Sequence, residues 1–296
     1  MQNRKKLLTI GAIALVVIVA LILLFWSGTD KDSLDTATGT QVSTSLPTVV
    51  LPNPRKNHNV PDFKAISDIQ TRKIEFFSYL LPAINEQNAH ILKKREQVTR
   101  LQKKHELGEP LNAREQRWLD NLATHYRVEA RTEADKFEIL LRRVDVIPDT
   151  LVLIQAANES GWGTSRFALD ARNFFGQWCW TEGCGLVPAS RGEGQNHEVR
   201  EFNSATESVR SYIRNLNTHD AYQDLRQIRA ELRRANAPIT AQPLTQGLMA
   251  YSERGEDYIV ELNQMIRVNL PIIQEVRGDV LGARGQSNQT ATSVTN

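Results

Sequence analysis

A glutamate stands near the end of an apolar helical segment in the stretch IQAANESGWGTS. Two glycines, Gly161 and Gly163, follow it almost at once and predict the end of a helix. Glu159 therefore falls in the last turn, where the negative end of the helix macrodipole disfavours a carboxylate. Apolar neighbours such as Trp162 and Phe167 would disfavour the charge further by desolvation. A carboxyl group that stays protonated near neutral pH can act as a general acid, for instance toward the leaving oxygen of a glycosidic bond. The alternative is an ordinary carboxylate in a salt bridge at a helix end.

The residues around Glu159 form a longer motif. The pattern A-x-x-E-S-G-W-G-x-S followed by N-x-F-G is carried by Ala156, Glu159, Ser160, Gly161, Trp162, Gly163, Ser165, Asn173, Phe175 and Gly176. It resembles the motif of the glucosaminidase family of peptidoglycan hydrolases, family 73 of the glycoside hydrolases. The segment AYSERGEDYIVEL resembles a second family motif, Y-A-T-D-P-x-Y, with Tyr251 and Tyr258 in register. The resemblance covers about residues 135–272, and the words GQWCWTEGCGLVP and NLNTHDAYQDLR resemble the Bax-like bacterial branch of the family.

The resemblance implies a lysozyme-like α+β fold that hydrolyses the β-1,4 bond after N-acetylglucosamine in bacterial wall glycan, with Glu159 as general acid. The family's second carboxylate lies on a hairpin after the N-x-F-G segment. Hairpin spacing favours Glu198, and Glu182, Glu193 and Glu201 are the alternatives. If HEVREF is a strand, Glu198 and Glu201 lie on opposite faces, so only one of them can face the acid. A lytic transglycosylase with the same acid, and a glycan-binding scaffold without catalysis, are the alternative functions.

Several residues near the motifs are candidates for glycan binding, because aromatic rings pack on the apolar faces of sugars while polar groups bind hydroxyls. These candidates are Trp162, Asn173, Phe175, Trp178, Trp180, Tyr222 and Tyr258. Tyr251 resembles the family tyrosine close to the acid, where its hydroxyl could orient the substrate's acetamido group or a water. Core packing is the alternative for each of these side chains.

The two cysteines, Cys179 and Cys184, lie in CWTEGC and predict a small disulfide ring outside the cytoplasm, with free thiols as the alternative. Zinc would need two further ligands, and only His197 lies nearby. HEVRE is not the H-E-x-x-H zinc pattern, because its last residue is Glu201. We therefore expect no metal. The chain also has no phosphate-binding glycine loop and no serine nucleophile signature, and we expect no cofactor. A net charge of +2 gives no reason to expect nucleic acid as a partner.

The elements that must position these residues are mainly helical. Residues 62–134 show helical periodicity that breaks at GEPLN, where Asn112 and Glu115 predict a capping pair for the next helix. Residues 135–275 then form the expected catalytic domain, in which HEVREF belongs to a small β-hairpin or loop lobe. The expected class is mainly α or α+β.

The first residues predict a membrane anchor over residues 1–26. Basic residues at positions 4–6 precede an apolar run over 7–26, which is long enough to span a bilayer and lacks a good cleavage site for signal peptidase. A cleaved signal peptide is the alternative. We expect a flexible linker over 27–61 and a disordered tail over 276–296. The basic flank predicts a single-pass inner-membrane protein whose catalytic domain faces the periplasm and the peptidoglycan. The sequence identifies no protein partner.

Overall fold

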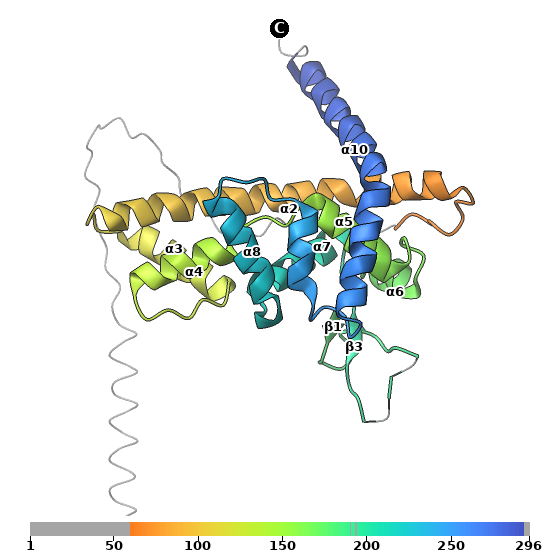
Figure 1. Ribbon diagram of the computed structural model, residues 1–296, viewed down its shortest axis with the longest axis horizontal. Coiled ribbons are helices and arrows are strands. Elements are labelled where there is room, and N and C mark those ends of the chain that lie inside the picture. The colour runs from red at the N-terminus through yellow and green to blue at the C-terminus, as the bar shows by residue number, and fades with distance from the viewer. Residues whose placement is uncertain (1–59, 190, 193, 293–296) are drawn as a thin grey trace, which may run out of the picture. The chain divides into compact units, whose positions relative to one another are not determined.

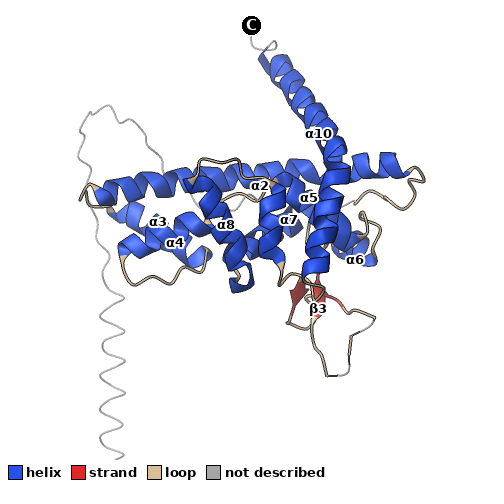
Figure 2. Ribbon diagram, viewed as in Figure 1, coloured by secondary structure: helices blue, strands red, loops and turns tan. Residues whose placement is uncertain are grey.

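A computed structural model describes residues 60–292 apart from 190 and 193, with side chains as far as residue 278. The described part is mainly helical (Figures 1 and 2), as predicted for a mainly α or α+β protein. Its α-helices are α2 (Ile69–Glu106), α3 (Ala113–His125), α4 (Glu133–Arg143), α5 (Asp149–Ser160), α6 (Arg166–Ala171), α7 (Ala205–Thr218), α8 (Gln223–Arg234), α9 (Ala241–Thr245) and α10 (Glu256–Thr292). Two 3-10 turns, Asp220–Tyr222 and Gln246–Leu248, and the strands β1 (Trp178–Cys179), β2 (Gly185–Leu186) and β3 (Glu198–Arg200) complete the list.

None of the helices within residues 60–292 is long and apolar enough to cross a membrane. The predicted anchor over residues 1–26 and all but the last two residues of the predicted linker over 27–61 lie outside the described residues.

Much of the described molecule packs against helix α2. Asp68 caps its N-terminus by accepting a hydrogen bond from the backbone N–H of Thr71 at 2.7 Å. Apolar residues at helix spacing, including Phe77 and Ile84, are fully buried. Pro82 lies inside the helix. Helices α4, α5, α7 and α10 all pack against α2 (Figure 1).

The predicted helical region over residues 62–134 and the predicted catalytic domain over 135–275 share one hydrophobic core. Helix α4 crosses the boundary between them. The ring of Phe76 in α2 lies 5.9 Å from the ring of Trp162 and 6.2 Å from that of Phe174, measured between centroids. The apolar stripe of α2 is therefore buried against the part of the chain that carries the glutamate motif.

Local capping explains where the shorter helices begin. As predicted, α2 ends before GEPLN and Asn112 caps α3, accepting from the backbone N–H groups of Arg114 and Glu115 while the Glu115 carboxylate accepts from the N–H of Asn112. Thr132 and Asp135 form the same reciprocal box at the start of α4. These caps satisfy backbone groups that a helix start leaves without partners.

A buried ionic cluster ties the segment before α5 to α8. Asp145 is 2% exposed and accepts hydrogen bonds from the Arg233 guanidinium at 2.7 and 3.0 Å. Arg229 is fully buried and donates to the backbone carbonyls of Asp145 and Val146 at 3.2 and 3.0 Å. Since buried charges need partners, this cluster fixes the chain where it enters α5.

The strands form a small antiparallel sheet in the order β1-β3-β2, which confirms the strand predicted in HEVREF. Cys179 pairs with Glu198 on one side of β3, and Gly185 pairs with Arg200 on the other. A Cβ atom at Gly185 would lie 2.0 Å from the carbonyl oxygen of Val199, so only glycine fits at this close approach.

Helix α10 continues to Thr292, where the sequence predicted a disordered tail from residue 276. Glycines such as Gly278 do not end it, because a single glycine costs only about 1 kcal/mol relative to alanine in a helix. Residues 293–296 lie outside the described residues.

Candidate active site

The turn after α5 is fixed by backbone hydrogen bonds. Gly161 adopts the left-handed conformation expected at a helix end, with φ of 56°. Its N–H and that of Trp162 donate to the same carbonyl one turn back, and the N–H of Gly163 donates to Ser160 Oγ at 2.8 Å. Glu159 thus lies in the last turn of α5, as predicted.

Aromatic residues from the N-terminal part of the described chain pack against this turn. Gly163 has a φ of 76°, and a Cβ atom there would lie 2.4 Å from the ring of Phe63. Trp162, a predicted glycan contact, packs on Phe76 and has the ammonium of Lys73 5.0 Å from its ring centroid. It is half-buried, and it lines a groove of about 630 Å³ along α10.

Glu159 lies in surroundings that favour its protonated form. It is half-buried, and the hydroxyl of Tyr258 donates to its Oε1 at 2.7 Å. Burial raises the pKa of Glu159 above its ordinary value, while the hydrogen bonds from Tyr258 and Asn158 act in the opposite direction. The charge of Glu261 raises the pKa and that of Arg254 lowers it, but these two residues pair with each other at 2.7 Å. A raised pKa is what a general acid needs at neutral pH, and this arrangement gives no support to the alternative of a salt-bridged carboxylate.

A buried chain of hydrogen bonds leads to Glu159. The hydroxyl of Tyr212 donates to the side-chain oxygen of Gln155, and Gln155 Nε2 donates to the hydroxyl of Tyr258 at 2.9 Å. Tyr258 then donates to Glu159, so Gln155 and Tyr258 each accept one hydrogen bond of the chain and donate the next. Gln155 and Tyr212 were not among the residues predicted from the sequence. The available signal was the spacing of Gln155 and Glu159, which places them on one face of the helix.

Tyr251 lies one ring further from the acid than the sequence predicted. Its ring stacks on that of Tyr258 at 5.7 Å, but its hydroxyl donates to the backbone carbonyl of Phe175 at 3.1 Å. The tyrosine that binds Glu159 is therefore Tyr258, which was predicted as a substrate contact. Tyr222 is 8% exposed and its ring lies 6.0 Å from that of Tyr251, so the tyrosines form a row that begins at the acid.

Asn173 and Phe175, two predicted substrate contacts, are buried and hold the chain in place. The amide of Asn173 donates to the backbone carbonyls of Gln177 and Arg200 at 2.8 and 2.9 Å, and its oxygen accepts from the N–H groups of Phe175 and Gln177. Phe175 stacks on Tyr212 with 4.0 Å between ring centroids. Since these side chains are 1% and 3% exposed, they offer no surface to a glycan, and the prediction of substrate contact does not agree with their burial.

Trp178 and Trp180, by contrast, are on the surface. They are 55% and 65% exposed, and both contact His197, with 4.1 Å between the stacked rings of Trp178 and His197. Both line a groove of about 350 Å³ that also contains Arg127 and Arg214. An exposed indole pair beside polar groups is a suitable surface for sugar rings.

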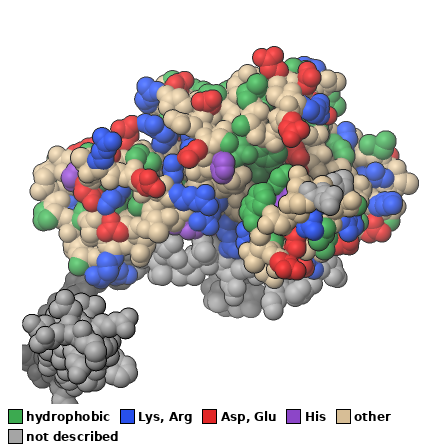
Figure 3. Space-filling view, turned by 90° about the horizontal axis from the view of Figure 1, so that it is seen from below, with side chains coloured by type: hydrophobic (Ala, Val, Ile, Leu, Met, Phe, Trp, Pro, Cys, Tyr) green, Lys and Arg blue, Asp and Glu red, His purple; other side chains and the backbone are tan. Residues whose placement is uncertain are grey.

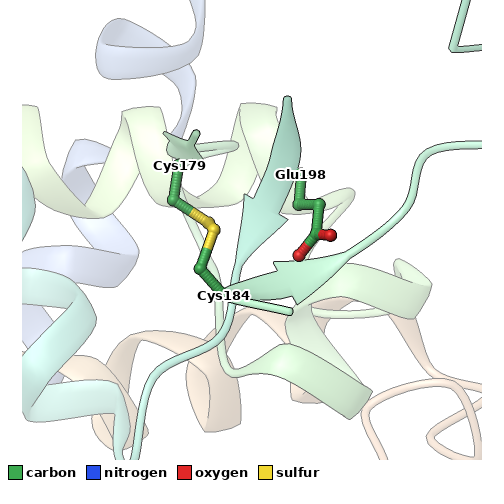
Figure 4. Close-up of side chains that lie close together, drawn as sticks. All are labelled: Cys179, Cys184 and Glu198. Atoms are coloured by element: carbon green, nitrogen blue, oxygen red, sulfur yellow. A yellow bond between two sulfur atoms is a disulfide. The ribbon is translucent and has the colours of Figure 1, made fainter. Parts of the chain in front are cut away.

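The predicted disulfide between Cys179 and Cys184 is present, and Glu198 lies beside it (Figure 4). The Glu198 carboxylate accepts hydrogen bonds from the backbone N–H groups of Gly183 at 3.0 Å and Gly185 at 2.8 Å. These bonds hold the pKa of Glu198 below its ordinary value. The two sulfur atoms and the carboxylate lie within 4.8 Å of one another, but disulfide sulfurs are not thiolates and do not present the usual ligands of a metal.

The other candidates for the second carboxylate lie in different surroundings. Glu182 is exposed, and Glu201 lies 3.4 Å from the guanidinium of Arg172. Glu193 lies outside the described residues.

Comparisons with known proteins match the region that contains this site. Residues 134–270 match the glucosaminidase family model, described as mannosyl-glycoprotein endo-beta-N-acetylglucosaminidase. The chain is 34% identical over 223 residues to protein bax of Escherichia coli (strain K12), an alignment that covers 75% of this chain and 78% of the relative. No solved structure matches the chain.

Proposed function

The chain is a Bax-like member of the glucosaminidase family of glycoside hydrolases, and we propose that it cleaves the β-1,4 bond after N-acetylglucosamine in peptidoglycan. The observation that carries this proposal is the half-buried Glu159 at the end of α5, with a raised pKa and a donated hydrogen bond from Tyr258. The exposed Trp178 and Trp180 supply the sugar-binding surface in this proposal.

In the first step, Glu159 gives its proton to the glycosidic oxygen while the bond between that oxygen and the anomeric carbon breaks. Glu159 then becomes a carboxylate. Its hydrogen bond from Tyr258 strengthens at that moment, because hydrogen bonds to ionised acceptors are about twice as strong as neutral ones. Gln155 keeps the Tyr258 hydroxyl aimed at the acid, since its own N–H occupies the hydroxyl's acceptor side.

We assign the attack on the anomeric carbon to the acetamido oxygen of the substrate's own N-acetylglucosamine. The support is the state of Glu198, whose carboxylate already accepts two backbone hydrogen bonds and has a lowered pKa, which makes it a weak base. The attack closes a positively charged oxazolinium ring, in which the nitrogen keeps its hydrogen, as the leaving sugar departs. Water then opens this ring at the anomeric carbon and returns a proton to Glu159, so the acid is restored. Substrate-assisted hydrolysis of this kind occurs in other glycosidase families.

A lytic transglycosylase is the second candidate, because it too needs only one acid, and the engagement of Glu198 with the loop fits it equally well. That reaction ends by internal attack of a muramic acid hydroxyl and leaves an anhydro sugar. Mass spectrometry of digested wall separates the two reactions. Reducing N-acetylglucosamine ends support our proposal, and anhydromuramic ends would replace it with the transglycosylase.

Catalysis itself is tested by comparing the wild type with Glu159→Gln on purified wall. The variant keeps the size of the side chain and removes the transferable proton. We expect the wild type to release soluble fragments and the variant to release none while still binding wall. If both proteins bind wall and leave it equally intact, the chain is a glycan-binding scaffold.

We also propose that residues 7–26 anchor the protein in the inner membrane and that the domain containing Glu159 faces the periplasm. The support is the apolar N-terminal run with its basic flank and a disulfide that suits an oxidising compartment. Fractionation and protease protection of intact spheroplasts would test this. A domain that stays in the soluble fraction, or that protease reaches only after lysis, would contradict it.

A further inference from the structure

A second cavity, of about 180 Å³, opens beside the groove that contains the exposed tryptophans. Its walls come from α2, the end of α3, β3 and α7. Arg200, Ser211 and Arg214 line both this cavity and the larger groove, so the two spaces adjoin. The cavity is smaller than the roughly 300–1,000 Å³ of a complete small-molecule site. It therefore suits one end of a ligand whose main part lies in the neighbouring groove.

Cations dominate the lining of this cavity. Lys94, Arg200, Arg210 and Arg214 all line it, while Glu207 is its only carboxylate among the described residues. Glu207 is engaged elsewhere, because it accepts from the backbone N–H of Asn203 at 3.0 Å and from its amide at 2.9 Å. Basic side chains gather beside a hydrophobic surface on the face seen from below (Figure 3).

Lys94 is a half-buried candidate for an anion ligand in this group. It lies half-buried on α2, and within residues 60–278 no side chain or carbonyl accepts a hydrogen bond from its ammonium group. Among the described residues, Arg214 donates only to the backbone carbonyl of His125, at 3.2 Å. Among the described residues, the cavity thus holds two cations that bind no carboxylate, Lys94 and Arg214, and its one carboxylate, Glu207, is engaged by Asn203.

The titration of neighbouring groups reflects this positive potential. Burial, and after it the charge of Arg210, lowers the pKa of Lys94. Burial and the charges of Arg214, Lys94 and Arg210 lower the pKa of His125 to about 4, so this imidazole is neutral at pH 7. An anion in the cavity would oppose these effects by stabilising the charged form of each group.

We propose that this cavity binds the carboxylate groups of the peptide stems that branch from wall glycan, while the sugars lie on the tryptophan surface of the adjoining groove. This inference rests on the proposed function for the identity of the polymer. Guanidinium groups suit carboxylates because they offer paired donors in a planar fork. A membrane surface fits less well, since a flat layer of lipid headgroups does not enter a recess to reach a half-buried lysine in its wall.

The test measures binding rather than turnover, using the full chain with Glu159→Gln so that the substrate stays intact. The probes are glycan strands with their peptide stems and the same strands stripped of stems by an amidase, at one ionic strength. We expect the stem-bearing strands to bind more tightly. Adding Lys94→Gln should weaken the binding of stem-bearing strands about three- to tenfold. This loss of affinity lies between that expected for an exposed ion pair and that expected for a charge-assisted hydrogen bond. Binding of the stripped strands should not change.

Two variants make the comparison specific. Lys93→Gln removes the same charge from the preceding residue of α2, which is exposed and does not line the cavity, and should leave binding to both strands unchanged. Lys94→Arg keeps the charge and should retain most of the preference. Thermal unfolding of each variant checks that the fold is intact.

Equal binding of the two strands by the parent protein would overturn the inference, as would an equal loss for both strands in Lys94→Gln. If Lys94→Gln instead weakened only binding to vesicles that contain anionic phospholipid, the cavity would be a lipid site and the stem assignment would be wrong. The hydrolase proposal fails on different evidence, namely wild-type protein that leaves wall intact, so the two failures can be told apart.

Discussion

Replacing Tyr258 by phenylalanine removes one oxygen atom and two hydrogen bonds, one of them buried and the other partly buried. The hydroxyl donates to Glu159 Oε1 at 2.7 Å and accepts from Gln155 Nε2 at 2.9 Å. Gln155 is fully buried, so its N–H would lose its acceptor without gaining access to water. An unsatisfied buried donor costs about 1–3 kcal/mol. We expect Tyr258→Phe to lower the free energy of unfolding by about 2 kcal/mol, which corresponds to a fall in Tm of about 4–8 °C for a domain of this size.

The same change should move the pH dependence of hydrolysis. A general acid must be protonated, so activity falls as pH rises through the pKa of Glu159. The hydrogen bond from Tyr258 opposes the effect of burial on that pKa. Without the bond the pKa rises further, and the basic limb of kcat/KM moves to higher pH. The rate at the optimum should fall roughly ten- to a hundredfold, because the carboxylate that forms during bond cleavage loses a donor worth about 1.5–3 kcal/mol.

The assay follows the release of reducing ends from purified wall across the acid and neutral range. Tyr251→Phe is the matched control. It makes the same change on the adjacent ring, whose hydroxyl binds the Phe175 carbonyl instead of the acid. It should lower stability without moving the basic limb. If Tyr258→Phe lowers Tm but leaves the limb in its wild-type position, Tyr258 has only a structural role and the reasoning about the acid is wrong.

Three further outcomes can be checked on the same protein. Glu159→Gln should raise the free energy of unfolding at neutral pH by about 0.5–2 kcal/mol, and with it Tm, because it removes a carboxylate whose folded-state pKa is raised. This gain should shrink as pH falls, because the carboxyl group of the wild type is then protonated. Glu198→Gln should reduce turnover only modestly but speed hydrogen exchange at the amides of Gly183 and Gly185; a loss of turnover as complete as that of Glu159→Gln would make Glu198 the base or nucleophile instead. Trp180→Ala should raise KM for wall roughly three- to tenfold with no change in Tm, since the ring is 65% exposed; an unchanged KM would remove this residue from the glycan surface.

Features set by neighbours in the sequence could be predicted. The helix end at Gly161 and the placement of Glu159 in the last turn follow from local backbone preferences, as does the capping pair of Asn112 and Glu115. The disulfide between Cys179 and Cys184 spans only a short loop, so it too was accessible from spacing.

Features set by distant residues could not be predicted. Gln155 and Tyr258 are 103 residues apart, and no local pattern distinguishes Tyr258 from Tyr251 as the partner of the acid. Burial of Asn173 and Phe175 depends on packing against α7 and β3, which the motif alone does not reveal. The sequence also placed Glu198 correctly in the hairpin but gave no sign that loop amides would engage its carboxylate.

The contact between Gly163 and Phe63 affects how the protein can be divided. Residues 134–270, which match the family model, include Glu159 and its tyrosines but exclude Phe63 and the whole of α2. A shortened protein cut at those limits would keep Glu159 and the tyrosines near it. It would lose Phe63 and Phe76, so the turn after α5 would be exposed on the side where these rings pack. The segment that matches the family model is therefore shorter than the part of the chain that forms the hydrophobic core, and truncations should begin ahead of Phe63.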